Sequence, residues 1–215
     1  MNVSRVAIVH GSPSSIATMR RIVGGAPEYV LVFEAFDAGQ MLRRIASHGV
    51  DLVLLSLEIA GVDEGESITR LTEAGAKVLV VAGDHGREFA KVYAALERGA
   101  IDVVDLPSLD ESGHPKGVEA FRAKLMSVRR LLGPSVVRAG PNAPVEKRQS
   151  VRPTSRLPLL AIGASTGGPN AIARVLADLP RPIDYAIVVV QHVDPAFSGT
   201  VASWIARASG VPVEA

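Results

Sequence analysis

The stretch Asp51-Leu52-Val53-Leu54-Leu55-Ser56 decides the fold of the first part of this 215-residue chain. An apolar run without a polar break is typical of a strand buried on both faces, as in a parallel sheet. Four similar runs surround it, at residues 6–9, 29–33, 77–81 and 101–104. Apolar residues at helical spacing lie between and after these runs. They predict one helix that ends near residue 23 and others at about 41–49, 64–74, 88–98 and 115–132. The sequence therefore predicts an α/β domain with a five-stranded parallel sheet.

Composition limits the class of protein. Hydrophobic residues make up 47% and charged residues 21%, with a mean hydropathy of +0.25, so the chain can bury a core and is not globally disordered. A net charge of +1 gives no whole-protein electrostatic case for binding nucleic acid or an anionic membrane. The lack of cysteine excludes disulfides, thiolate zinc sites and a Cys nucleophile. No apolar run approaches the ~18 residues of a membrane span, so we expect a cytoplasmic protein without membrane insertion.

The character of the chain changes between residues 134 and 156. Four prolines lie there among Gly, Ser and Asn, and five basic residues face one acid, Glu146. This composition predicts a semi-extended linker between two domains. The linker is either a docking arm for an acidic surface or a solvated connection without a binding role. We therefore expect a first domain at 1–133, a linker at 134–156 and a second domain at 157–215.

The second domain shows the same alternation of strand and helix. Strands are expected at 159–162 and 183–190, and helices from Pro169 to about 179 and at 197–209. This order predicts the start of a parallel, Rossmann-like α/β domain. A third strand is expected at the end of the chain. Because two strands cannot cover their own sheet edges, we expect the polypeptide to be the N-terminal part of a longer protein.

The turn Gly163-Ala164-Ser165-Thr166-Gly167-Gly168-Pro169 carries the candidate chemistry. A strand that runs through a Gly-rich turn into a helix gathers backbone N–H groups and the positive end of the helix dipole at one point. Ser165 lies at the apex as a candidate nucleophile, where the N–H groups can bind a developing oxyanion. His192 ends the next strand. The carboxyl ends of adjacent parallel strands meet, so His192 is the candidate base.

Two other interpretations of this turn stay open. Its glycines look superficially like the dinucleotide fingerprint of short-chain dehydrogenases. That family needs a Tyr-x-x-x-Lys pair, but Val189 stands at the lysine spacing after Tyr185, and no acid ends the second strand. The turn can also be purely structural. The residue pattern favours a serine hydrolase over both.

The segments AIGASTGGP (161–169), LP (179–180) and VVQHV (189–193) closely resemble the catalytic domain of the chemotaxis protein-glutamate methylesterases. Those response regulators place a receiver domain and a linker before the esterase. The resemblance implies a receiver-like (flavodoxin-like) first domain and a serine esterase that hydrolyses glutamate methyl esters and also deamidates glutamine. The residues it implies are Ser165 as nucleophile, His192 as general base, and Thr166, Gly167 and Gly168 around the oxyanion and substrate.

The resemblance also implies partners and a subtype. The substrate would be the cytoplasmic helical region of methyl-accepting chemoreceptors, a chemosensory histidine kinase would be a partner, and no cofactor or metal is implied. Segments 99–107 (GAIDVVDLP) and 190–197 (VQHVDPAF) look more like the Wsp-type members of surface-sensing pathways. The acid of the family's triad lies far downstream, beyond residue 215, and Asp194 on the loop after the strand is not assigned that role. We therefore expect residues 1–215 alone to be inactive or weak.

The first domain departs from the receiver pattern at each position that carries chemistry. A working receiver has an acidic pair for Mg²⁺ after the first strand, an aspartate ending the third, a hydroxyl residue after the fourth and a lysine after the fifth. The residues found there are His10 and Gly11, Ser56, Ala82 and Leu106. We expect a pseudo-receiver with Ser56 at the degenerate phosphoacceptor position, without metal binding or aspartyl phosphorylation. The alternative for the whole chain is a non-catalytic regulatory or docking module.

Overall fold

The computed structural model describes residues 3–59, 66–83, 91–92, 94–109, 115–132, 158–193 and 198–215. The chain divides into two compact units, Met1–Leu132 and Gly133–Ala215, and each is described by itself. The predicted linker at 134–156 lies outside the described residues. Of the predicted helix at 88–98, residues 88–90 and 93 also lie outside them. Residues 91–92 and 94–97 of that helix are helical.

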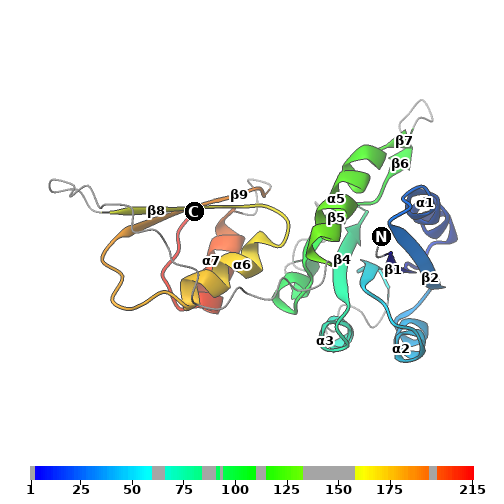
Figure 1. Ribbon diagram of the computed structural model, residues 1–215, viewed down its shortest axis with the longest axis horizontal. Helices are drawn as coiled ribbons and strands as arrows, with labels where there is room; N and C mark the ends of the chain where they lie inside the picture. Colours follow the sequence, from blue (N-terminus) through cyan, green and yellow to red (C-terminus); the bar gives the residue numbers. More distant parts are fainter. Residues whose placement is uncertain are drawn as a thin grey trace. The chain divides into compact units, whose positions relative to one another are not determined.

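Five parallel strands form the sheet of the first unit (Figure 1). Their spatial order is β2-β1-β3-β4-β5, which confirms the predicted five-stranded parallel α/β fold. The doubly wound order follows from the chain, because right-handed crossovers carry successive strands first to one side of β1 and then to the other. The strands are β1 (Ser4–Val9), β2 (Tyr29–Ala35), β3 (Leu52–Ser56), β4 (Lys77–Ala82) and β5 (Asp102–Asp105).

Helices cover both faces of this sheet. They are α1 (Pro13–Gly24), α2 (Ala38–Ser47), α3 (Glu66–Glu73) and α5 (Val118–Leu131). Local chemistry starts two of them: the Ser12 hydroxyl accepts a hydrogen bond from the Ser15 N–H at 3.4 Å, and the Asp37 carboxylate accepts one from the Gln40 N–H at 2.7 Å. Both are N-caps that satisfy a backbone donor left free by the helix.

The sheet separates two apolar cores. Strand residues alternate between them, so that Val6 and Ile8 face α1 and α5, whereas Ala7 and Val9 face α2 and α3. Each face is closed by buried helix side chains: Ile16, Met19, Phe121 and Leu125 on one side, and Met41, Ile68 and Leu71 on the other. This two-sided burial explains the unbroken apolar runs of the sequence.

A short hairpin was not expected from the sequence. Strands β6 (Ser108–Leu109) and β7 (Pro115–Lys116) pair antiparallel, and α5 begins only at Val118 instead of 115. The helix starts late because Gly117, at φ 83°, takes the left-handed conformation that separates the hairpin from the helix.

The second unit is a two-stranded parallel sheet with two helices on one face (Figure 1). Its elements are β8 (Leu159–Ala164), α6 (Gly168–Ala177), β9 (Ala186–Gln191) and α7 (Ser198–Ser209). Within the described part of the chain, the opposite face carries no helix, and Leu159, Val188 and Val190 on it are 63%, 47% and 65% exposed. The predicted third strand is wrong: residues 210–215 form no strand, since a strand needs a paired neighbour and, within the described residues, β8 and β9 pair only with each other.

The two helices of this unit pack through apolar faces. Ile172 and Leu176 of α6 and Val201, Trp204 and Ile205 of α7 are buried. Within the part of the chain that the structure describes, none of the helices combines the length and the apolar character needed to cross a bilayer.

Candidate active site

The predicted nucleophile lies on the turn that joins β8 to α6. Ser165 follows the last residue of β8 directly and is exposed, while Thr166 and Gly167 are half-buried and Gly168 is buried. Gly167 has φ 72°, which only glycine adopts without strain. The Gly168 N–H donates to the Ser165 carbonyl at 2.7 Å and closes the turn. Among the described residues, no side chain caps the start of α6 and its first turn holds no acid, so the positive end of the helix dipole lies at this loop.

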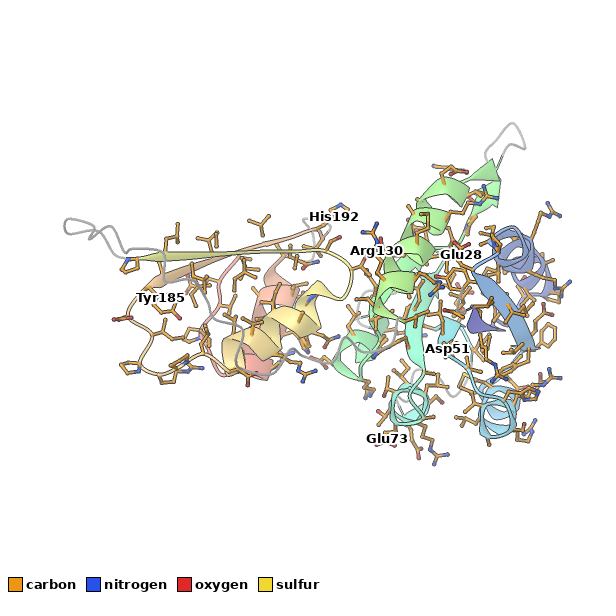
Figure 2. The ribbon with its side chains drawn as sticks, viewed as in Figure 1. Glu28, Asp51, Glu73, Arg130, Tyr185 and His192 are labelled. Carbon is orange, nitrogen blue, oxygen red and sulfur yellow. The ribbon has the colours of Figure 1, made fainter. Side chains whose placement is uncertain are left out.

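The predicted base lies at the end of the neighbouring strand (Figure 2). Ala164 and Gln191 are the last register pair of β8 and β9, so Ser165 and His192 each follow that pair by one residue. The His192 N–H donates to the Ala164 carbonyl at 3.2 Å, which holds the two chain segments together. His192 is exposed, as Ser165 is. The strand ends therefore bring the two residues side by side in the backbone.

The side chains of this pair are not joined in the structure. Among the hydrogen bonds of the described residues, none links the Ser165 hydroxyl to the His192 ring. Catalytic hydrogen bonds are often long in a protein without its substrate. The contact between the two groups, and with it their catalytic roles, stays a prediction.

Gln191 is a site residue to which sequence reasoning gave no role. Its Nε2 donates to the carbonyl of Ser165 at 3.0 Å and to the carbonyl of His192 at 3.2 Å. Its Oε1 is buried, has no hydrogen-bond partner among the described residues, and lies against Gly168. The sequence offers one sign of such a role, the polar side chain of Gln191 at an inward position of β9, where the other inward positions hold Ile187 and Val189.

In the first unit, His10 and Ser56, which the sequence comparison with receivers predicted to replace the metal-binding and phosphoacceptor residues, lie buried at the carboxyl ends of adjacent strands. The Ser12 N–H donates to His10 Nδ1 at 2.9 Å. Burial lowers the pKa of His10, and the negative charge of Glu58 offsets part of that shift. The Ser56 hydroxyl accepts a hydrogen bond from the Glu58 N–H at 3.2 Å, so the chain itself uses this oxygen.

The residues at the other two predicted receiver positions are apolar. Ala82 ends β4 and is fully buried, and Leu106 follows β5 and is half-buried. Over the described ranges, the side chains of His, Asp and Glu nowhere gather in a group of three or more that could hold a metal ion.

Comparison with known proteins finds relatives that span both units. Residues 160–215 match the family described as CheB methylesterase. A protein-glutamate methylesterase/protein-glutamine glutaminase of Pseudomonas fluorescens (strain Pf0-1) is 33% identical over 210 residues, which make up 97% of this chain and 61% of that protein. A protein of the same name from Burkholderia pseudomallei (strain 1710b) is 35% identical over 97% of this chain and 60% of its own. The chain thus spans about three fifths of the length of these relatives.

Solved structures give the fold of the larger part. The signal receiver domain of the response regulator NarL from Mycobacterium tuberculosis superposes with a TM-score of 0.50 at 21% identity, covering 60% of this chain and 98% of that one. The response regulator domain of Thermotoga maritima CheB gives 0.50 at 18% identity, covering 61% and 96%. These likenesses show a receiver fold. Over 97% of its length the chain is similar in sequence to proteins named protein-glutamate methylesterase/protein-glutamine glutaminase, and its residues 160–215 match the CheB methylesterase family.

Proposed function

We propose that the chain carries the nucleophile and the base of a protein-glutamate methylesterase, with Ser165 and His192 in those roles. The observation that carries the proposal is the register of β8 and β9. The pair Ala164 and Gln191 ends both strands together, so Ser165 and His192 leave the sheet at the same edge. The names of the relatives supply the reaction class.

The proposed reaction is acyl transfer through a covalent intermediate. His192 takes the proton of the Ser165 hydroxyl while the oxygen attacks the γ-carbonyl carbon of a glutamate methyl ester. The oxyanion forms beside Thr166, Gly167 and Gly168, at the dipole end of α6. The ester bond breaks, methanol leaves with the proton from His192, and water then releases glutamate from Ser165. A glutamine side chain follows the same course with ammonia as the leaving group.

The substrate follows from the same resemblance. We propose that the ester lies on the cytoplasmic helical region of a methyl-accepting chemoreceptor, which places the protein in the cytoplasm beside a chemosensory histidine kinase. The surface-sensing, Wsp-type subtype stays a proposal that rests on the segments 99–107 and 190–197.

The first unit is proposed to be a pseudo-receiver. The support comes from the groups at the carboxyl edge of its sheet. The pKa of the buried His10 imidazole is lowered, which favours its neutral form, and the Ser56 hydroxyl is hydrogen-bonded to the backbone. Ala82 and Leu106 are apolar. Mg²⁺ prefers carboxylate oxygens, and Ser56 offers none. We therefore propose that aspartyl phosphorylation does not control this protein and that protein contacts take that place.

Esterase activity from residues 1–215 is expected to be weak. Among the described residues, no carboxylate is hydrogen-bonded to the His192 ring. An imidazole without an orienting acid loses about 10⁴-fold in rate in serine proteases. The competing proposal is a docking module without catalysis.

Methanol release from a methylated receptor fragment tests these proposals. Two proteins are compared: residues 1–215, and a chimera in which the remaining two fifths of the Pseudomonas fluorescens relative follow residue 215. We expect turnover in the chimera, little in residues 1–215, and none in either with Ser165→Ala. Thr200→Ala, which removes an exposed hydroxyl of α7, is the control and keeps the activity. A chimera that is inactive, or active without Ser165, overturns the esterase proposal.

A further inference from the structure

We propose that Gln191 is a positioning residue whose single amide group holds the backbone of Ser165 and the backbone of His192 in fixed relation. This inference rests on the proposed function, in which those two residues are nucleophile and base. It adds a residue that touches neither substrate nor the reacting atoms.

The hydrogen bonds define the orientation of the amide. Nε2 faces two carbonyl oxygens, those of Ser165 and His192, at 3.0 and 3.2 Å. A carbonyl oxygen accepts and never donates, so only the NH₂ end of the amide suits this place. Gln191 thus ties together a residue 26 positions away in the chain and its own next neighbour.

The Ser165 carbonyl is held from two directions. It accepts from Gln191 Nε2 at 3.0 Å and from the Gly168 N–H at 2.7 Å. The peptide plane after Ser165 is therefore fixed on both sides, which limits how far the hydroxyl-bearing residue can move. Since the same amide binds the His192 carbonyl, displacement of one strand end is transmitted to the other.

Close packing fixes the other end of the amide. A Cβ added at Gly168 would stand 2.0 Å from Gln191 Oε1 and 2.8 Å from its Cδ. The observed position of the Gln191 amide therefore requires glycine at 168. Oε1 is buried and finds no hydrogen-bond partner in the part of the chain that the structure describes, a condition that proteins normally avoid because it costs stability. A residue kept only to close two strands would not need this amide; an apolar side chain would fill the space without the cost.

Isosteric variants separate positioning from packing. Gln191→Glu keeps the shape but replaces the donor NH₂ with a carboxylate facing two carbonyls. Gln191→Met keeps the volume and removes the polar group. Ile187→Val, at an inward position of the same strand, is the matched control. In the chimera that continues past residue 215 with the remaining part of the Pseudomonas fluorescens relative, covalent labelling of Ser165 by a fluorophosphonate gives two readouts, the rate constant and the final labelled fraction, and neither needs the receptor.

We expect both Gln191 variants to label Ser165 about 10- to 100-fold more slowly, the size of effect that small misplacements produce, with the final labelled fraction unchanged. Ile187→Val labels at the wild-type rate. A fall in the labelled fraction at an unchanged rate constant means unfolding alone and overturns the proposal, as do rates within twofold of wild type. If wild-type Ser165 labels but releases no methanol from the receptor, the proposed function fails and the positioning role stands. A wild-type Ser165 that never labels overturns both.

Discussion

The phenol of Tyr29 donates a hydrogen bond of 2.5 Å to the carbonyl oxygen of Leu125, and so joins β2 to α5 across 96 positions of the chain. Both residues are buried in the core between α1, α5 and the sheet. The bond reaches from an edge strand to the last helix of the first unit. It therefore reports whether the C-terminal helix is docked.

Replacing this phenol tests the bond. Tyr29→Phe is expected to lower the free energy of unfolding of the first unit by about 1 kcal/mol, measured by urea unfolding with circular dichroism. Burial also raises the pKa of Tyr29 to about 12. The unfolded chain loses this proton near pH 10 and the folded chain near 12, so stability falls as the pH rises between them. Tyr29→Phe removes that slope, whereas Tyr185→Phe in the second unit leaves it intact. An unchanged slope in Tyr29→Phe would contradict the assignment.

His10 should make the first unit sensitive to mild acid. Its pKa is lowered in the folded state from an ordinary 6.5, so below that pH the unfolded chain binds more protons and the free energy of unfolding falls. Protonation also removes the Nδ1 acceptor used by the Ser12 N–H. His10→Asn keeps an acceptor and cannot titrate. Its unfolding free energy should change less than that of wild type between pH 7 and 5 in urea titrations. Equal slopes for the two proteins would exclude His10 as the cause.

The proposed pseudo-receiver is not expected to bind phosphate mimics. Beryllofluoride with Mg²⁺ is expected to leave the amide NMR spectrum of the first unit unchanged, because no aspartate stands at position 56 to accept it and no acidic pair holds the metal. A receiver with an intact aspartate is the positive control. Saturable shifts centred on Ser56 and His10 would count against the proposal.

Gly168 and Gly163 offer a matched pair of glycines on either side of Ser165. Gly168→Ala should destabilise the second unit by about 1–3 kcal/mol, as overpacking does, because its Cβ meets Gln191 Oε1 at 2.0 Å and Ala164 Cβ at 2.9 Å. Gly163→Ala meets nothing within 4 Å and should stay within about 0.5 kcal/mol. Fluorescence of Trp204, the single tryptophan, follows unfolding. Equal effects of the two substitutions would show that the space at Gly168 does not matter.

The bare face of β8 and β9 should cause self-association of residues 1–215. Exposed apolar patches on a sheet favour contact between molecules. Sedimentation is expected to give an apparent mass that rises with concentration. Val188→Thr with Val190→Thr keeps β-branched residues and should reduce that rise. Val175→Thr, an equally exposed valine on α6, should have no effect. A monomer at every concentration would contradict the prediction.

The fold could be predicted where burial leaves a mark on the sequence. The five strands of the first unit can be recognised in the sequence because each is an apolar run. The glycines of the 163–168 turn indicate a tight connection between strand and helix. The hairpin of β6 and β7 was missed because strands of two residues are too short to show a period. The third strand of the second unit was expected from alternation alone, and alternation does not supply a pairing partner.

The candidate site could be predicted only in part. Ser165 and His192 follow strands, and adjacency of strand ends can be deduced from topology. The role of Gln191 depends on which backbone carbonyls lie near its amide after folding, and one of those belongs to a residue 26 positions earlier. Spacing along the chain carries no information about that geometry. Polarity at an inward position was the one available sign.

The two cores of the first unit have a consequence for how the chain finds its pairing. Strands that are apolar on both faces can slip by one residue and merely exchange their cores, so hydrophobicity does not oppose the error. A polar contact at the other end of the strands does oppose it. The Arg5 N–H of β1 donates to the Asp51 carboxylate, directly before β3, at 2.7 Å, and a slip of either strand against the other would separate the two. This one carboxylate therefore favours the native alignment of β1 and β3 during folding.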